Sequence, residues 1–355
     1  MKVNNKIIKS LFLSLTMVTC ISVNAGNEDR AGSAGATELL INPWARSSGW
    51  ADAAVSSITG LEAIFTNVAG LAYTDKTEII FARTNWLGNI SGIGLNGAGL
   101  AQRVGETSVI GISVVSMNYG DIPITTTELP EGGIGNFSPR SMNFNLAYAK
   151  QFSSSISGGL TVKVVSESIS NTRAQGGAFD AGIRYVTGEN DHIKFAISLK
   201  NVGPPMAFSG DGLSIDMLNA STSLLIGSQQ RVSAFELPSQ LHIGASYDFI
   251  FSENSSLTMA TTFTSNSFSR DQWRAGAKYL LRSSKAHFIL RAGLVYERDI
   301  FNADIATALA GPTGGFSVDF PMGENGTTIG LDYCYRHSIL GAIHTVGGRI
   351  NLGNK

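Results

Sequence analysis

The chain has 355 residues, with 26 lysines and arginines against 27 aspartates and glutamates, so its formal net charge is -1. Only 15% of the residues are charged, whereas 43% are hydrophobic and 40 are glycine. This balance excludes a disordered chain and offers no cationic footprint for a nucleic acid, so we expect no nucleic-acid partner. No linker rich in proline or charge divides the chain, which predicts one large domain after the amino-terminal segments.

Residues 1–25 have the layout of a secretory signal peptide. A lysine-containing start precedes an apolar run over 11–23 and a small-residue cleavage site that ends at Ala25. The alternative, a membrane anchor, is disfavoured because the run is shorter than the roughly 18 to 20 residues of a spanning helix. Cleavage removes Cys20 and leaves Cys334 alone, so the exported chain has no internal disulfide and depends on packing and strand pairing.

The next segment, residues 26–76, does not alternate cleanly and is interrupted at Asn42-Pro43. A disordered periplasmic tail is the plain alternative, but it fits poorly with the large apolar side chains here. These are Leu39, Leu40, Ile41, Trp44, Trp50, Ile64, Phe65 and Leu71. We predict that the segment folds inward as a partly helical hatch, or plug, because the barrel deduced below has an interior that needs filling.

From Thr77 to the end, apolar residues recur with period two, which predicts strands with one apolar and one polar face. Near 141–150, for example, the apolar positions are Met142, Phe144, Leu146 and Tyr148. Turn residues divide the region into fourteen segments, longer than the five or six residues of most soluble strands. The predicted strands cover 77–86, 89–102, 106–119, 140–151, 155–169, 175–187, 192–201, 238–250, 255–264, 272–282, 286–297, 311–320, 326–336 and 342–352.

Charge placement supports a membrane barrel. Ten charged residues fall on the polar register, where a wet or ion-paired lumen can hold them: Asp180, Arg184, Lys194, Lys200, Asp248, Arg274, Lys278, Arg291, Asp332 and Arg336. On the lipid register, a mid-membrane arginine or lysine would cost about 2 to 4 kcal/mol. A soluble sandwich with one wet face is the alternative that the pattern leaves open.

The connections sort into two classes if the first strand rises from the periplasm. One end then has short turns, and the other has the long connections, above all the loops 120–139 and 202–237. Short periplasmic turns and longer external loops are typical of outer-membrane barrels. The predicted fold class is an all-β transmembrane protein, a closed antiparallel 14-stranded outer-membrane β-barrel over residues 77–355, in the bacterial outer membrane with its lipid as a partner.

Several segments resemble the PorV/PorQ family of outer-membrane proteins, over nearly the whole mature chain. They are Pro43-Trp44-Ala45-Arg46-Ser47-Ser48-Gly49, Asp52-Ala53-Ala54, the hatch motif Asn67-Val68-Ala69-Gly70-Leu71-Ala72, Asn118-Tyr119-Gly120-Asp121-Ile122, and Leu199-Lys200-Asn201-Val202-Gly203-Pro204-Pro205-Met206. The family resembles the FadL-type channels in fold, with fourteen strands and an amino-terminal hatch.

That resemblance implies a component of the type IX protein secretion system of Bacteroidota. The expected partners are the secretion translocon barrel, the carboxy-terminal signal domain of exported cargo and the proteins of the surface attachment complex. The alternative function is a FadL-like outer-membrane channel for hydrophobic small molecules, which predicts a continuous apolar pocket between hatch and wall. The sequence leaves both open because fold does not fix function.

The external loops carry the candidate partner-binding residues, since long apolar loops need cover. These candidates are Tyr119, Asp121, Ile122, Phe137, Pro204, Pro205, Met206 and Phe208. The favoured prediction is that the apolar loops fold over the barrel mouth. The alternative is that they present hydrophobic side chains as anchors to a protein partner.

Catalytic and cofactor motifs are weak. The glycine spacing over 92–97 matches a dinucleotide loop but lies within alternating strand rather than before a helix. The five histidines show no paired ligand spacing and Cys334 stands alone, so no metal site is expected. We expect no enzyme and no cofactor, since no nucleophile elbow is present and the lumen charges read as a solvated, salt-bridged interior.

Overall fold

The computed structural model describes residues 26–353, apart from 89–91, 219–223, 299, 301, 303–306 and 323–325. The predicted signal peptide therefore lies outside the described residues. Among the described residues, no helix is both long and apolar enough to cross a membrane.

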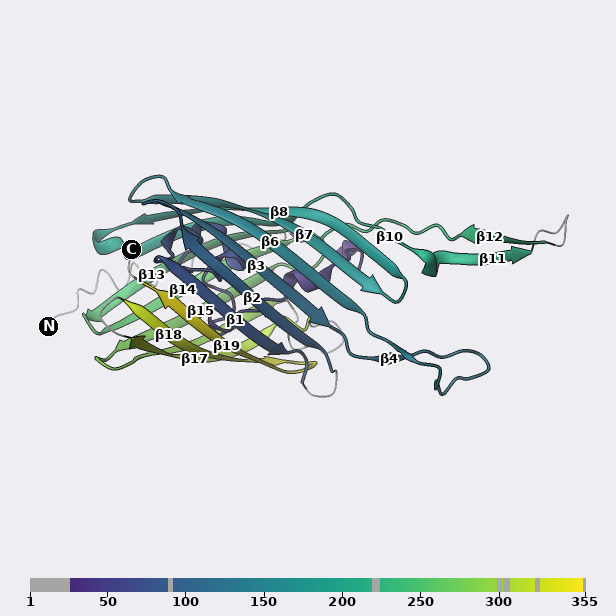
Figure 1. The fold of residues 1–355 in the computed structure, drawn as a ribbon. Helices are drawn as coiled ribbons and strands as arrows, with labels where there is room; N and C mark the ends of the chain where they lie inside the picture. Colours follow the sequence, from purple (N-terminus) through teal and green to yellow (C-terminus); the bar gives the residue numbers. More distant parts are fainter. Residues whose placement is uncertain are drawn as a thin grey trace.

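Fourteen antiparallel strands close into one barrel (Figure 1). β1 pairs with β19 and β8 pairs with β9, so the sheet has no open seam. The strands are β1 (Thr77–Asn85), β2 (Gly94–Arg103), β3 (Ser108–Asn118), β6 (Arg140–Gln151), β7 (Ile156–Ile169), β8 (Thr172–Thr187), β9 (Ile193–Val202), β13 (Gln240–Ser252), β14 (Ser255–Asn266), β15 (Gln272–Arg282), β16 (His287–Glu297), β17 (Gly311–Met322), β18 (Thr327–Ser338) and β19 (Gly341–Leu352). A short strand, β10 (Phe208–Ser209), extends the sheet beside β8. The predicted fold class is confirmed.

Two predicted strand boundaries differ from the observed ones by three residues or more, and the others lie within two. The second strand was predicted from residue 89, but β2 begins at Gly94, and 89–91 lie outside the described residues. The sixth was predicted from 175, whereas β8 begins at Thr172 because β7 and β8 meet in a tight turn at Ser170 and Asn171. Ser170 takes the left-handed conformation, with φ at 50°, that such a turn requires.

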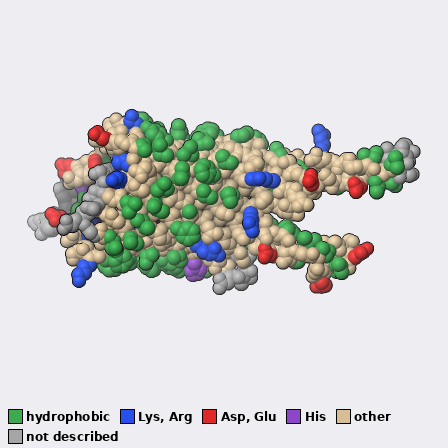
Figure 2. Space-filling model, in the orientation of Figure 1, with side chains coloured by type: hydrophobic (Ala, Val, Ile, Leu, Met, Phe, Trp, Pro, Cys, Tyr) green, Lys and Arg blue, Asp and Glu red, His purple; other side chains and the backbone are tan. Residues whose placement is uncertain are grey.

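Side chains alternate between the two faces of the wall. On β6 the exposed positions are Met142, Phe144, Leu146 and Tyr148, and the buried ones between them include Ser141, Asn143 and Asn145. Figure 2 shows the resulting cover of hydrophobic side chains on the barrel wall. An apolar surface of this extent is stable in contact with lipid rather than water.

The ten lumen charges named above all face inward, as predicted, but the expectation of a solvated interior was wrong. Asp180, Lys200 and Arg336 are among those that are buried, and only Lys194, Asp248 and Lys278 are half-buried. Six of the ten form ion pairs with described residues, whereas Arg184 donates to the Ile58 carbonyl at 3.1 Å and Lys200 lies 3.6 Å from the centre of the Phe65 ring.

The hatch, residues 26–76, consists of helical segments of one or two turns joined by irregular chain and lies inside the barrel (Figure 1). The turns are η1 (Glu28–Arg30), η2 (Thr37–Leu40), α2 (Ala45–Ser48), α3 (Ala63–Thr66) and η3 (Val68–Tyr73). Its first residues lie at the external end, where the amide of Asn27 donates to the Asn266 carbonyl at 3.3 Å. Its last residues reach the periplasmic end, where the Arg103 guanidinium donates to the Ala72 carbonyl at 3.1 Å.

The hatch touches the wall most closely where the wall has no side chains. Gly276 and Gly293 are opposite one another on β15 and β16, and a methyl group on either would come within 2.6 Å of the Trp50 backbone. Trp44, Leu61 and Leu71 are almost fully buried within the same core. The middle of the lumen is therefore packed like a protein interior.

Two hairpins project beyond the barrel at the external end (Figure 1). One, here called the short arm, holds β4 (Ile122–Pro123) and β5 (Asn136–Phe137). The other, the long arm, follows η5 (Asp211–Leu213) and holds β11 (Ser214–Leu218) and β12 (Leu225–Gln229). At the opposite end, η4 (Glu189–Asp191) makes a short turn between β8 and β9.

Candidate functional site at the external mouth

The external mouth of the barrel is closed by residues 32–41 of the hatch, here called the mouth segment. Ala34 forms a parallel bridge with Glu236, and the Gly35 amide donates to the Glu236 carbonyl at 3.1 Å. Just before the segment, the Arg30 guanidinium lies 2.6 Å from the Glu236 carboxylate in an exposed ion pair. Exposed pairs contribute little, so the bridge and side-chain packing hold the segment.

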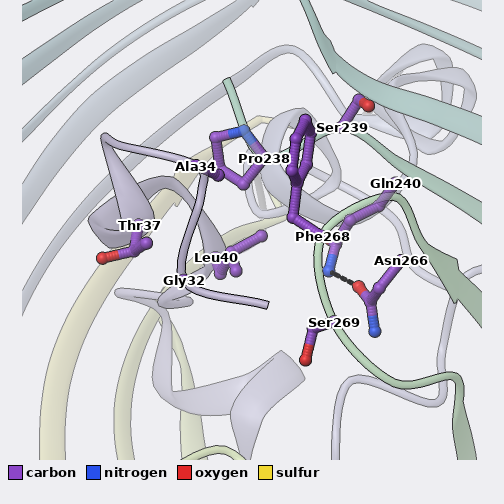
Figure 3. A pocket seen from close by; sticks show the side chains of 10 residues that line it. All are labelled: Gly32, Ala34, Thr37, Leu40, Pro238, Ser239, Gln240, Asn266, Phe268 and Ser269. Carbon is purple, nitrogen blue, oxygen red and sulfur yellow. Dashed lines mark hydrogen bonds between the residues drawn. The ribbon is translucent and has the colours of Figure 1, made fainter. Parts of the chain in front are cut away.

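A small cavity of about 60 Å³ lies between the mouth segment and the external ends of β13 and β14 (Figure 3). Leu40, Pro238 and Phe268 give it apolar walls. Its other side is polar, where the Gln240 amide donates to Asn266 at 2.6 Å. The full lining is Gly32, Ala34, Thr37, Leu40, Pro238, Ser239, Gln240, Asn266, Phe268 and Ser269.

Two apolar clusters flank the mouth segment. The first surrounds Leu39 and includes Ala36, Val165, Ala174, Ala178, Met206 and Leu237, with Phe208 and Phe235 packed against it. The second surrounds Ile41 and includes Trp86, Leu95, Val115, Met117 and Ile343. Removal of the mouth segment would therefore leave apolar surface on both sides of the mouth.

A carboxyl group is buried within this apolar closure. Glu38 is 4% exposed and faces Glu167 of β7. Burial, and then the Glu167 charge, raise the pKa of Glu38 to about 8. Burial and then Glu38 also raise the pKa of Tyr119 to about 12. The mouth segment consequently packs best when Glu38 is protonated.

Deeper in the lumen, Asp52 ties the hatch to two sides of the wall. Its carboxylate lies 2.9 Å from the Arg336 guanidinium and 3.8 Å from that of Arg274, and it accepts from the Asn42 amide. Burial opposes its charge, but the two arginines outweigh burial and hold the pKa of Asp52 below its usual range. Ala51 and Asp52 both have φ values in the left-handed region, at 64° and 55°, which is costly for residues other than glycine. This ion pairing therefore stabilises a strained bend.

A second ion cluster joins the hatch to β1. Arg46 lies 2.9 Å from Glu62 and 3.0 Å from Glu78, and Glu62 also accepts from the Ser47 amide at 2.8 Å. Glu78 accepts from the Leu61 amide at 2.6 Å. One arginine thus compensates two buried carboxylates, each of which also holds hatch backbone in place.

The structure separates the predicted site residues into three groups. Met206 is buried in the mouth and Phe208 packs beside it, while Pro204 and Pro205 are exposed nearby. Ile122 and Phe137 pair with each other on the short arm, and Asp121 at its base accepts from Ser138; Tyr119 lies beside the second apolar cluster. The hatch-motif residues Asn67, Ala69, Gly70 and Leu71 are buried near the periplasmic end. The Asn67 side chain accepts from the Ala69 amide at 3.1 Å and so begins the η3 turn.

The favoured reading of the apolar loops was wrong for most of their length. Residues near 206 and 235–237 do fold into the mouth, but both arms stand away from it with apolar side chains exposed, such as Leu129, Ile134, Leu224 and Leu225. Where a continuous apolar pocket between hatch and wall was expected, the structure has small cavities, of about 60 Å³ at the mouth and about 10 Å³ beside Asn42 and Ser48.

Sequence reasoning missed Glu38, Arg46 and Glu62 as organising residues. A usable signal was present: charged residues inside a segment of mostly small and apolar residues must find partners when that segment is buried. Metal binding has no support in the described part of the chain, where no three histidine, cysteine or acidic residues gather around a common point.

Comparisons with known proteins agree with the fold. No protein-family model matches the chain, and no curated protein matches it either. Among solved structures, the CymD monoaromatic hydrocarbon channel aligns with a TM-score of 0.52 and 12% identity over 88% of this chain and 97% of that one. A TodX monoaromatic hydrocarbon channel with a ΔS2 mutation aligns with a TM-score of 0.51 and 10% identity over 87% of this chain and 97% of that one. A Pseudomonas aeruginosa FadL homologue aligns with a TM-score of 0.49 and 12% identity over 86% of this chain and 96% of that one.

Identities this low show a shared fold. With the closed wall, the apolar outer face and the internal hatch, they make this chain a bacterial outer-membrane β-barrel that shares its overall fold with the CymD and TodX channels.

Proposed function

We propose that the barrel admits small hydrophobic molecules from outside and passes them inward when the mouth segment moves. The observation that carries this proposal is the pair of apolar clusters around Leu39 and Ile41, which a single short segment separates and covers. Two solved structures that share the fold, CymD and TodX, are monoaromatic hydrocarbon channels, which is consistent with such a role. We therefore propose that the protein binds small hydrophobic molecules and lets them pass, and we propose no catalysis.

In this proposal the structure corresponds to the closed state. An apolar cavity of roughly 150 Å³ is needed to hold benzene, and the mouth cavity is about 60 Å³. A ligand must therefore displace the mouth segment, whose departure would expose the apolar surface that the ligand then covers. Uptake and movement of residues 32–41 are coupled in this mechanism.

A reversible cross-link tests the proposal. Ala34 and Glu236 are bridge partners, so Ala34→Cys with Glu236→Cys places two thiols within disulfide range. We expect the oxidised double variant in proteoliposomes to lose uptake of radiolabelled toluene, and a reductant to restore it. The matched control is Asp216→Cys with Gly227→Cys, which cross-links paired strands of the long arm away from the mouth. Wild-type uptake by the oxidised mouth variant would refute the proposal.

A second candidate is the type IX secretion role, as an accessory or carrier barrel that binds the translocon, cargo signal domains or the attachment complex. The specific observation in its favour is the exposure of both arms: Leu218, Leu224 and Leu225 on the long arm are 65–71% exposed, more than a water-facing ribbon of this size would normally leave uncovered.

Removal of residues 211–230 tests this second candidate. We expect the truncated barrel to fold normally but to leave exported cargo unattached in cells, while toluene uptake continues. Normal attachment in a strain without paralogues would exclude the secretion role. Since the cross-link and the truncation affect different parts, the two candidates can fail separately.

A further inference from the structure

The outer wall carries a polar, cationic patch at the external ends of its first strands. We call it the margin patch and define it by Arg83, Asn118, Arg140, Ser166, Ser168 and Arg173. These side chains are on the outward register, because their neighbours Ser141 and Ala174 face the lumen and are buried. The three arginines are exposed.

Strand register joins most of the patch into one row. Asn118 is opposite Arg140, Arg140 is opposite Ser168, and Ser168 is opposite Arg173. The row therefore crosses β3, β6, β7 and β8 without a break. Arg140 and Arg173 are two strands apart, which separates their backbones by roughly 10 Å.

The patch borders the lipid-facing surface directly. Two rows toward the periplasm, the outward positions are Val114, Phe144 and Val164, all apolar and 37–49% exposed. Figure 2 shows lysine and arginine side chains where the hydrophobic cover ends and the arms begin. An outward arginine is costly at the bilayer centre and nearly free at its surface, so the row marks the depth at which lipid head groups start.

The three arginines are available to an external anion. Among the described residues, none of them forms an ion pair within 4.0 Å. Two of them donate to neutral groups: Arg173 donates to Ser166 at 3.0 Å, and Arg83 donates to Asn96 at 3.0 Å. A guanidinium offers a planar fork of donors that fits phosphate, and the serine hydroxyls beside it can also donate.

The opposite side of the barrel is different. The outward residues at the external ends of β15, β16 and β18 include Trp273, Tyr296 and Tyr335. Aromatic side chains are the ordinary residues of a membrane interface and carry no charge preference. On that side the exposed Arg298 follows Tyr296 beyond the end of β16, so the β1–β8 side differs in carrying a continuous row of outward polar and cationic residues along its strands.

We propose that the margin patch binds the phosphate-bearing head groups of anionic lipids in the outer leaflet. Charge complementarity identifies the ligand, and continuity with the apolar wall identifies its source, because acyl chains that pack on Phe144 and Val164 place their head groups at Arg140 and Arg173. The patch thereby selects which side of the barrel a phosphorylated lipid occupies.

The test is a titration of the whole mature barrel in neutral detergent with lipid A that carries two phosphates, followed by native mass spectrometry. The variant is Arg83→Gln/Arg140→Gln/Arg173→Gln. We expect about fivefold weaker binding per arginine removed, hence on the order of a hundredfold for the triple variant. Lys150→Gln is the matched control, because Lys150 is an outward cation at the periplasmic end of β6.

Three results would overturn the proposal: equal affinity of the triple variant and wild type, an equal loss in Lys150→Gln, or displacement of lipid A by millimolar inorganic phosphate. Two results would support the proposal. The variant Arg83→Lys/Arg140→Lys/Arg173→Lys should recover part of the affinity for lipid A, and dephosphorylated lipid A should bind the wild type weakly. The heat-dependent mobility of a folded barrel on a denaturing gel shows that each variant has folded.

Discussion

Individual residues decide how firmly the mouth is closed. Glu38 is buried beside Glu167, and its pKa is raised to about 8. A raised carboxyl pKa means that the packed state prefers the protonated form. Its stabilising contribution is therefore complete below the ordinary carboxyl pKa of 4.5, falls as the pH rises above that value, and is lost by about pH 8.

We expect the mouth segment to loosen between pH 6 and pH 9. Hydrogen exchange over residues 34–41, corrected for the intrinsic rate, should show lower protection at the higher pH. Glu38→Gln keeps a neutral side chain of the same shape and should remove most of this dependence, with the remainder due to Glu167, whose pKa burial also raises. Asp29→Asn removes one charge from the exposed start of the hatch and should leave the dependence intact. A pH dependence as large in Glu38→Gln as in the wild type would rule out this account.

Arg46 makes a second prediction at this scale. Arg46→Met leaves the carboxylates of Glu62 and Glu78 buried without their cation, which typically costs about 3–5 kcal/mol. Urea unfolding of the protein in detergent measures the loss. Adding Glu62→Gln and Glu78→Gln should recover most of it, because the uncompensated charges are then gone. A triple variant no more stable than the single one would show that geometry, not charge, is responsible.

Among the elements, the hatch depends on glycines of the wall that it touches. A methyl group at Gly293 would meet the Trp50 carbonyl carbon at 2.5 Å, which forces the hatch or the strand to shift. Overpacking of this kind costs about 1–3 kcal/mol. The contact is backbone against backbone, so no side-chain rotation relieves it.

We therefore expect Gly293→Ala to lower protection of the hatch against exchange or proteolysis while the barrel stays closed. Gly348→Ala on β19 is the control, because its methyl group would have no atom within 4 Å. If both variants protect the hatch as wild type does, the close approach at Trp50 has no energetic importance.

The elements also differ in how far the sequence could predict them. The strands follow from period two because lipid faces one side of each strand, so residues such as Phe144 and Asn145 differ in kind. The hatch was recognisable from its large apolar residues, but its partners were not, since Asp52 pairs with Arg336 at a separation of 284 residues. Nothing local in the sequence encodes such a pairing.

The long loop that carries the long arm also shows how far the sequence can predict the structure near the mouth. Met206 and Leu225 are both apolar residues of one long loop, yet Met206 is buried and Leu225 is 71% exposed. The composition of the loop predicts the same position over the mouth for both residues. Their difference comes from the bridge between Met206 and Phe235, which closes the base of the loop over the mouth and leaves the remainder outside.

At the scale of the whole molecule, pairing of the first and last strands makes the wall continuous. Thr77 lies opposite Leu352, and Asn85 lies opposite His344. Deletion of 341–353 would leave the edges of β1 and β18 open, and lipid offers no hydrogen-bond partners for them. We expect this truncation to give no heat-modifiable band on a denaturing gel, whereas deletion of the long arm should leave that band unchanged. A folded band from the 341–353 deletion would mean that the strands can close without β19.

The route of the hatch has a consequence for biogenesis. The described chain starts at the external rim, passes down the axis and emerges at the periplasmic end before β1 begins. Such a filled cylinder is not readily made by closing the wall first and threading a folded plug through it afterwards. The strands must instead wrap around a core that is already in place, and the final zipping of β19 onto β1 seals the plug inside.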